Sequence, residues 1–355
     1  MSNTPILHVL IPDLLSPLKL WNQDFGFVAV TNETVALLAQ HQRNKVPFSG
    51  LDSSLFSLLG FSPETEIPYA FYRAKKERLK TVLGEHKGTI LCADPVHLKA
   101  GLSEIMMDRH DFNDLSDTDA DSLLELLNQH FFQDGLQFVK GSANRWYLLL
   151  ANDDSIRTTP LREMRAKDIS KKLPQSDRIN LHKIQNEIQM LLHSSEVNQR
   201  REQEGKLAIN SLWFWGGGTT LKARTRVRSV IGGGLHGEVV ASVADCRYLV
   251  SAIEPEKELS EMPAGGHHLL ILDQLTPFAL SDDLDGWQQE LNKLEKIWLA
   301  PVEKFFNKGK LKVLLHSCDG SVYIPKKTSV LNKLWRKVKG DNISLLALVG
   351  GGGNE

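Results

Sequence analysis

Cysteine is scarce in this chain, and long apolar runs are absent. The 355 residues include three widely spaced cysteines, Cys92, Cys246 and Cys318. An odd, widely spaced set argues against a disulfide framework and favours a reducing compartment. No apolar stretch approaches the ~20 residues of a membrane span. Residues 1–15 lack the basic start of a signal peptide, so we expect a cytoplasmic protein with no membrane partner.

An excess of charge of either sign is also missing. The chain has 42 Lys and Arg against 43 Asp and Glu, for a formal net charge of −1 at pH 7. Such a balance provides no global attraction to nucleic acid or to an acidic lipid surface, and we expect neither partner. Apolar residues make up 41% of the sequence, enough for a sizeable core. The length is typical of two domains.

A P-loop is absent as well. The glycines at 216–218 fail the G-x-G-x-x-G pattern in its last position, and no G-x-S-x-G or S-x-x-K pattern supports the serines at 53, 54 and 57. What the sequence does contain is an apolar, aromatic run that reaches these three glycines, over residues 210–218. This pattern predicts a buried strand followed by backbone with positive φ or close approach. An α/β fold places ligands at such a strand end, although a buried strand with a flexible exit fits equally well.

Three other predicted strands end in polar side chains. Residues 6–11 lead to Asp13, residues 267–272 lead to Asp273, and residues 311–315 lead to His316 and Asp319. In an open parallel sheet, ligands and metals collect at the carboxyl ends of the strands. For a single aspartate after a strand, a helix cap or a turn is the alternative interpretation.

The middle of the chain has a different pattern. Residues 117–132 predict an amphipathic helix with Ser116 as its N-cap, and residues 136–139 and 145–150 predict a hairpin. Together they favour a small α+β domain. Asp94 and His97 are close enough in sequence to share a site, but Asp94-Pro95 is also an ordinary turn start.

Basic residues follow the glycine run. Lys222 to Arg228 alternate with smaller residues, which predicts a strand with one basic face that could hold a phosphate or protect a sheet edge. Residues 326–339 form a basic tail that includes Trp335. Interleaved basic and aromatic residues can hold single-stranded nucleic acid, so a protein- or nucleic-acid-binding module is a further hypothesis.

Some segments carry a resemblance to known families. Asn210 to Gly218, preceded by Val197 to Arg200, resembles a segment of the archaeal-type cofactor-independent phosphoglycerate mutases of the alkaline phosphatase superfamily. Ala93 to Leu98, Asn186 to Met190 and the same tryptophan–glycine stretch are more similar to a bacterial family labelled "regulatory protein, RpfE type". The resemblance implies an α/β fold with an alkaline-phosphatase-like, mostly parallel sheet core, formed by residues 1–84 and 206–355. Residues 85–205 would be an inserted α+β cap.

The mutase resemblance further implies a two-metal site and a serine nucleophile, chemistry that needs several Asp and His residues around metals about 4 Å apart. Its candidate metal ligands are Asp13, Asp273, His316 and Asp319. The sequence departs from the family pattern because Leu14 stands where a glycine is expected and Pro277 where a histidine is expected. The serines at 53, 54 and 57 lie in no nucleophile motif.

We therefore expect a degenerate, non-catalytic relative with a binding or regulatory role. The alternative is an active metal-dependent phosphomutase or phosphatase. No cofactor is expected, apart from Mn²⁺ or Mg²⁺ if the metal site is retained, and the partner would be a small phosphorylated ligand or a protein. The residues predicted to line a core–cap cleft are Asp94, His97, Asp108, Arg109, Asn186, Glu187, Asn198, Arg200, Trp213, Trp215, Gly216 and Gly217.

Overall fold

The chain folds into two compact units. The computed structural model describes residues 4–31, 33–62, 64–79, 84, 86–100, 105–108, 112–152, 156–161, 164, 169–218, 220–223, 225–250, 255–326 and 345–346. The first unit combines Met1–Pro63 with Lys222–Glu355, and the second is Glu64–Leu221. One unit is thus inserted in the sequence of the other, and it begins before and ends after the expected range 85–205.

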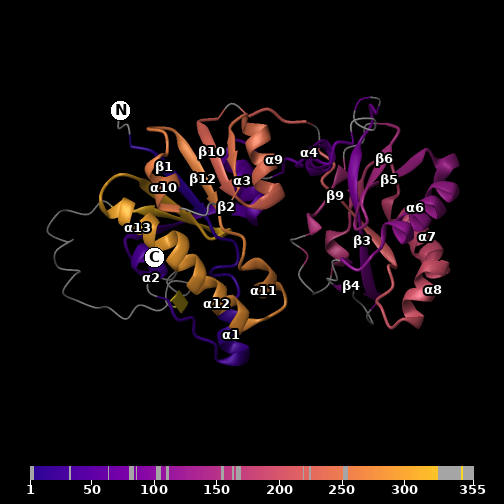
Figure 1. The fold of residues 1–355 in the computed structure, drawn as a ribbon, viewed down its shortest axis with the longest axis horizontal. Helices are drawn as coiled ribbons and strands as arrows, with labels where there is room; N and C mark the ends of the chain where they lie inside the picture. Colours follow the sequence, from indigo (N-terminus) through magenta and orange to yellow (C-terminus); the bar gives the residue numbers. More distant parts are fainter. Residues whose placement is uncertain are drawn as a thin grey trace. The chain divides into compact units, whose positions relative to one another are not determined.

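A seven-stranded sheet forms the centre of the first unit (Figure 1). The strand order is β11-β10-β12-β1-β13-β14-β2. The strands from β11 to β13 are parallel, whereas β14 is antiparallel to both of its neighbours. The prediction of an α/β fold with a mostly parallel sheet is therefore confirmed. The strands are β1 (Ile6–Leu10), β2 (His41–Ser49), β10 (Val227–Gly232), β11 (Arg247–Leu249), β12 (His267–Ile271), β13 (Lys312–His316) and β14 (Asp319–Pro325).

Alternate residues of these strands bury one face of the sheet in a core with helices. Leu7 and Val9 of β1 lie in the same cluster as Trp287 and Val302 from the helical layer, as the period-2 alternation of strands requires. The predicted break near Pro301 is a π-helical turn, η4 (Glu295–Leu299), between two helices. The helices are α1 (Leu18–Phe25), α2 (Glu33–Ala39), α3 (Leu51–Leu58), α9 (Gly234–Ala244), α10 (Pro255–Ser260), α11 (Thr276–Leu280), α12 (Leu284–Leu294) and α13 (Ala300–Asn307).

The second unit is built on an antiparallel sheet with the order β4-β3-β6-β5, to which β9 adds by pairing with β3. Figure 1 shows α6, α7 and α8 together beside this sheet. Ser116 caps α6 and a hairpin joins β5 to β6, both as predicted. The elements are α4 (Tyr69–Lys76), β3 (Ile90–Ala100), β4 (Ile105–Asp108), α6 (Asp117–Phe131), η1 (Phe132–Asp134), β5 (Leu136–Ser142), β6 (Arg145–Leu150), β7 (Ile156–Arg157), η3 (Ser170–Lys172), β8 (Gln175–Ser176), α7 (Leu181–His193), α8 (Glu196–Gln203) and β9 (Ser211–Trp215).

Two predictions about strands need correction. The tryptophan–glycine stretch is a buried strand, β9, but it runs antiparallel to β3 and does not belong to the parallel sheet. A strand that is buried on both faces is apolar throughout, whether its neighbours are parallel or antiparallel to it. The sequence of β9 therefore does not indicate in which direction it pairs. The basic strand predicted over Lys222 to Arg228 is also wrong, because β10 begins only at Val227.

The basic tail from residue 327 lies outside the described residues. None of the described helices has both the length and the apolar character that crossing a bilayer requires.

Buried histidines occupy the first unit's sheet. His8 Nε2 lies 2.8 Å from His267 Nδ1, and His8 Nδ1 lies 3.0 Å from His316 Nε2, which makes a row across three neighbouring strands. Burial lowers the pKa of His316 to about 4, and burial together with the neighbouring imidazoles lowers the pKa of His8. On β12, His268 Nδ1 lies 2.8 Å from Ser229 Oγ, and its Nε2 lies 3.2 Å from the Pro263 carbonyl oxygen. Burial likewise lowers the pKa of His268.

We expect acid to destabilise the fold through His268. Its native pKa lies below the ordinary 6.5, so the unfolded chain binds a proton that the native state resists once the pH falls below about 6.5. The contribution reaches at most about 1.4 kcal/mol per pH unit. Urea unfolding between pH 7.5 and 5 should show a shallower pH dependence for His268→Gln than for the wild type. The control His182→Gln, at an exposed position of α7, should retain the wild-type slope, and equal slopes for all three proteins would contradict the prediction.

Candidate functional site

An ion pair between Arg73 and Asp94 lies in the interior of the second unit. Arg73 Nη1 and Nη2 donate to the two carboxylate oxygens of Asp94, each at 2.8 Å, and both side chains are almost fully buried. Nη2 also donates to the Trp146 carbonyl oxygen, and Nε donates to the Tyr147 hydroxyl. Burial alone would lower the pKa of Arg73, but the Asp94 carboxylate raises it well above the ordinary value. The guanidinium therefore stays charged.

Aromatic and carboxylate groups complete this cluster. Trp215 Nε1 donates to Asp94 Oδ2 at 2.8 Å, and the Arg73 guanidinium lies 4.7 Å from the centre of the Tyr147 ring. Tyr147 in turn donates to Glu77 Oε2 at 2.6 Å. Burial raises the pKa of the Cys92 thiol and of the Tyr147 hydroxyl, so both stay protonated at neutral pH. Asp94 and Trp215, both predicted to line a cleft, bond to each other in the interior of this unit.

Arg73 was not among the predicted site residues. The basic residues that follow it, Lys75, Lys76, Arg78 and Lys80, taken alone indicate a solvated helix face. The available signal was that Arg73 shares its face of α4 with the buried Tyr69, Ala70 and Ala74. A basic residue on the apolar stripe of a helix needs a buried counter-ion.

Asn198 also has a partner inside the unit. Its amide oxygen accepts from the Ile209 N–H at 2.9 Å, and its amide nitrogen donates to the Ile209 and Leu192 carbonyl oxygens at 2.6 and 2.8 Å. We call this arrangement, in which one side-chain amide pairs with both main-chain groups of one residue, an amide clasp. Asn210 forms a second amide clasp on Leu98, with distances of 2.7 and 2.8 Å. The two clasps hold the chain that leads into β9.

The other predicted cleft residues of this unit are dispersed. His97 Nδ1 lies 2.7 Å from the Ala208 carbonyl oxygen, whereas Glu187 pairs with His130 on the helical side. Asn186 is exposed on α7, and Arg200 pairs with Asp119 at the surface. Asp108 ends β4 opposite His97 in the strand register. Arg109 lies outside the described residues. A cleft that uses this whole set remains a prediction.

The glycines after β9 are required for packing. Gly216 has φ +71°, its N–H donates to Thr158 Oγ1, and its carbonyl oxygen accepts from the Ala70 N–H. A Cβ on Gly217 would lie 2.4 Å from Leu91 Cδ2. Trp213 is fully buried, and its Nε1 donates to the Thr159 carbonyl oxygen. The run is thus a buried strand followed by closely packed glycines, and a ligand contact at these glycines stays a prediction.

The second candidate site is the carboxyl edge of the first unit's parallel strands. Asp13 and Asp273 follow the adjacent strands β1 and β12, and Asp319 begins β14 after β13. Asp13 Oδ1 accepts from Ser16 Oγ at 2.9 Å, and the Asp319 carboxylate accepts from Ser317 Oγ. His316 is directed along the sheet toward His8. Asp13 and Asp319 thus each bond to a nearby serine, and His316 bonds to His8 of the neighbouring strand.

The donor set at this edge does not fit a dinuclear metal centre. Over the part of the chain that the structure describes, no three His, Cys, Asp or Glu side chains are grouped so that they could hold a metal ion. Mn²⁺ and Mg²⁺ need several oxygen or nitrogen donors converging on one point. The assignment of Asp13, Asp273, His316 and Asp319 as metal ligands therefore remains a prediction from the family resemblance.

Comparison with known proteins shows a distant similarity to cofactor-independent phosphoglycerate mutases. No protein-family model matches the chain. A 2,3-bisphosphoglycerate-independent phosphoglycerate mutase of Methanosarcina mazei is 27% identical over 175 residues, which cover 48% of this chain and 42% of that protein. The corresponding Methanosarcina barkeri protein is 28% identical over 181 residues, 49% of this chain and 43% of that one. The similarity thus spans less than half the length of either relative.

The solved structures that match the chain include a cofactor-independent phosphoglycerate mutase from Thermoplasma acidophilum. The alignment covers 100% of this chain and 96% of that one, with 14% identity and a TM-score of 0.42. The PH0037 protein from Pyrococcus horikoshii aligns over 92% of this chain and 88% of its own, with 14% identity and a TM-score of 0.47. Similarity at this level says nothing about ligand or reaction.

Asp94→Asn should destabilise the protein strongly. The change keeps the shape of the side chain but leaves the Arg73 guanidinium buried without its counter-ion, which costs about 3–5 kcal/mol in comparable cases. Urea unfolding measures this loss. Arg200→Gln, which breaks the exposed pair with Asp119, is the matched control and should cost at most about 1 kcal/mol. Similar losses for the two variants would show that the buried pair is not a structural element.

Asn198→Ala should lower the free energy of unfolding by about 1–3 kcal/mol, because it leaves the buried main-chain groups of Ile209 without their partner. Asn186→Ala, at the exposed position of α7, serves as the control and should change stability by less than about 0.5 kcal/mol. Chemical denaturation of both variants measures the difference. A stable Asn198→Ala protein would return this residue to the list of ligand-binding candidates.

Proposed function

We propose that this protein is a non-catalytic relative of the phosphoglycerate mutases that binds a phosphorylated small molecule or a partner protein and acts as a regulator. Two features support a regulatory role over a catalytic one: the resemblance of its motifs to those of the bacterial RpfE-type regulatory family, and the departures from the mutase pattern at Leu14 and Pro277.

The observation that carries the proposal is the hydrogen bonding at the carboxyl edge of the parallel strands. A metal-dependent phosphoryl transfer needs carboxylates and imidazoles that converge on the metals. Here Asp319 is engaged with Ser317, Asp13 with Ser16, and His316 with the buried His8. Carboxylates and an imidazole held by such partners are suited to shaping a polar binding surface, which supports a binding role.

An active metal-dependent phosphomutase or phosphatase is the second candidate. It is favoured by the placement of Asp13 and Asp273 after adjacent parallel strands, which lie roughly 4.8 Å apart in any sheet. The names of the curated relatives also favour it, although the match extends over only part of their length.

Mutase and phosphatase assays with Mn²⁺ or Mg²⁺ distinguish the two candidates. We expect the wild type to show no turnover above background and no difference from Asp13→Ala. Metal-dependent turnover that disappears in Asp13→Ala would overturn the proposal in favour of the enzyme. A thermal shift with phosphoglycerate in the absence of metal, measured against glycerate as the unphosphorylated control, tests the small-ligand form of the proposal. If neither compound raises the melting temperature, the proposed partner is a protein. A pull-down with the purified chain tests that form of the proposal.

A further inference from the structure

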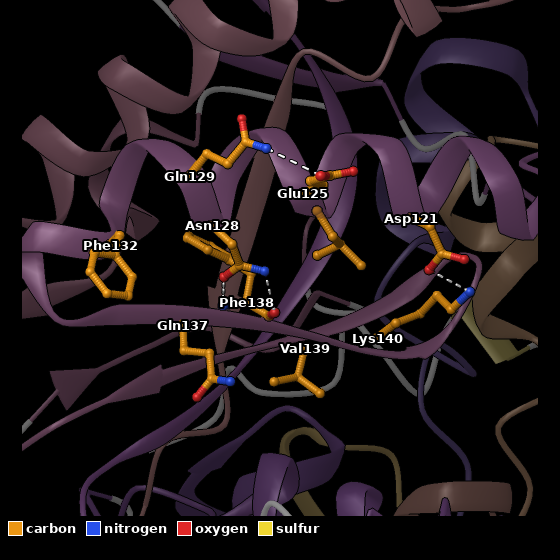
Figure 2. Close-up of a pocket in the computed structure, with 10 residues that line it drawn as sticks. Asp121, Glu125, Asn128, Gln129, Phe132, Gln137, Phe138, Val139 and Lys140 are labelled. Atoms are coloured by element: carbon orange, nitrogen blue, oxygen red, sulfur yellow. Dashed lines mark hydrogen bonds and ion pairs between the residues drawn. The ribbon is translucent and has the colours of Figure 1, made fainter.

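Several polar side chains in the groove between α6 and β5 pair within the protein. Figure 2 shows Asn128 of α6 reaching to β5, where it forms an amide clasp on Phe138 with distances of 2.7 and 2.9 Å. At one end of the groove, Lys140 pairs with Asp121 at 2.7 Å. These contacts hold the helix on the edge strand. The histidine row of the first unit differs, because at each of its ends one ring nitrogen bonds to no other residue that the structure describes.

This histidine row crosses the parallel sheet diagonally. His267 is the first residue of β12, His8 is the middle residue of β1, and His316 is the last residue of β13. In the strand register, His8 lies beside Leu269 and His316 lies beside Leu10, so each step of the row advances by two residues. Steps of two residues keep the three rings on one face, and the row advances by roughly 13 Å along the strands. It therefore joins the amino edge of the sheet to the carboxyl edge.

The three rings meet edge to edge. The facing nitrogens are 2.8 Å apart between His267 and His8, and 3.0 Å apart between His8 and His316. The corresponding ring centres are 5.0 and 5.2 Å apart, and these distances exceed the nitrogen distances by about the width of one imidazole ring. Each nitrogen therefore faces its partner along the direction of a ring N–H bond, at the length of an ordinary hydrogen bond.

Neutral rings give this row a direction. Burial is the main cause that lowers the pKa of His8, His267 and His316, so the three rings are neutral at pH 7. A neutral imidazole has one N–H and one bare nitrogen. Because His8 bonds through both nitrogens, it donates to one neighbour and accepts from the other. Two of the three N–H groups then lie inside the row, and the third is at His316 Nδ1 or at His267 Nε2.

We propose that His267, His8 and His316 form a proton relay through the parallel sheet, which carries one proton from a solvent acid at the amino edge to a basic oxygen of an anionic ligand at the carboxyl edge. A proton from the solvent acid bonds to His267 Nε2, and the proton of His267 Nδ1 passes to His8 Nε2. The proton of His8 Nδ1 passes to His316 Nε2, and the proton of His316 Nδ1 leaves to the basic oxygen. Each nitrogen that loses a proton keeps the electron pair, so every ring begins and ends neutral and the row has reversed its direction.

The test is the tautomer of His316 when the other end of the row is fixed. In His267→Asp the carboxylate only accepts, so His8 donates to it from Nε2 and must accept at Nδ1 from His316 Nε2. In His267→Lys the ammonium only donates, so His8 donates from Nδ1 and His316 must carry its proton on Nδ1. Ring ¹⁵N chemical shifts at pH 8 distinguish protonated from bare nitrogens. We expect opposite His316 tautomers in the two variants, and the same tautomer in both would overturn the proposal.

His268 is the matched control on the same strand. Its Nε2 lies 3.2 and 3.3 Å from the carbonyl oxygens of Pro263 and Gly265, and its Nδ1 lies 2.8 Å from Ser229 Oγ. Two carbonyl acceptors require a proton on Nε2. His268 should therefore keep this tautomer in both variants.

A measurement on the wild type covers the case in which a variant does not fold. Scalar coupling between the two nitrogens of each hydrogen bond should be detectable for both pairs of the row. The fraction of Nδ1–H should be equal in the three rings, because they reverse together. Inorganic phosphate, as the anionic probe, should raise this fraction in all three rings by accepting from His316 Nδ1. Missing couplings, unequal fractions, or a phosphate response that is absent or confined to His316 would overturn the proposal. The relay is present without a ligand, so the variants test it independently of the proposed function.

Discussion

The second unit depends on the buried charge pair of Arg73 and Asp94. Arg73 comes from α4 and Asp94 from β3, while Tyr147 of β6 and Trp215 of β9 complete the same cluster. A guanidinium that is out of water is tolerated only when its hydrogen-bond donors find acceptors. Four elements must therefore lie in one arrangement before the charge is satisfied. This constraint explains why the aspartate that looked like a ligand-binding residue is committed to the interior.

Side-chain amides perform a related task at the points where main-chain pairing stops. Asn210 and Asn198 hold Leu98 and Ile209 beside the start of β9, and Asn128 covers the free side of Phe138. A primary amide carries a donor and an acceptor with nearly the geometry of a peptide group. A side-chain amide can therefore extend the hydrogen-bond ladder of a sheet by one position without another strand. The three clasps of the second unit thus finish the sheet where the backbone turns away.

Local patterns allowed much of the fold to be predicted. The apolar run of β1, the apolar face of α6 with Ser116 before it, and the hairpin of β5 and β6 depend on neighbours a few residues apart. The partners that decide the role of a polar residue are distant. Asp94 was singled out, but its partner lies on another element, and the row formed by His8, His267 and His316 joins strands from opposite ends of the chain. Whether β9 pairs in a parallel or antiparallel direction also depends on its partner strand. The spacing of apolar residues within β9 does not reveal that partner.

The clasps also bear on how the protein ages. Spontaneous deamidation converts an asparagine into an aspartate, and asparagine is among the residues most subject to such damage. At Asn198 or Asn210 the product would set a carboxylate oxygen against a main-chain carbonyl oxygen, so an attraction would become a repulsion in the interior. Asn210 precedes a serine, a sequence that reacts readily in flexible peptides, but its placement in a rigid clasp on Leu98 holds back the backbone attack that starts the reaction. The lifetime of the folded chain is thus coupled to bonds that at first sight only complete a sheet.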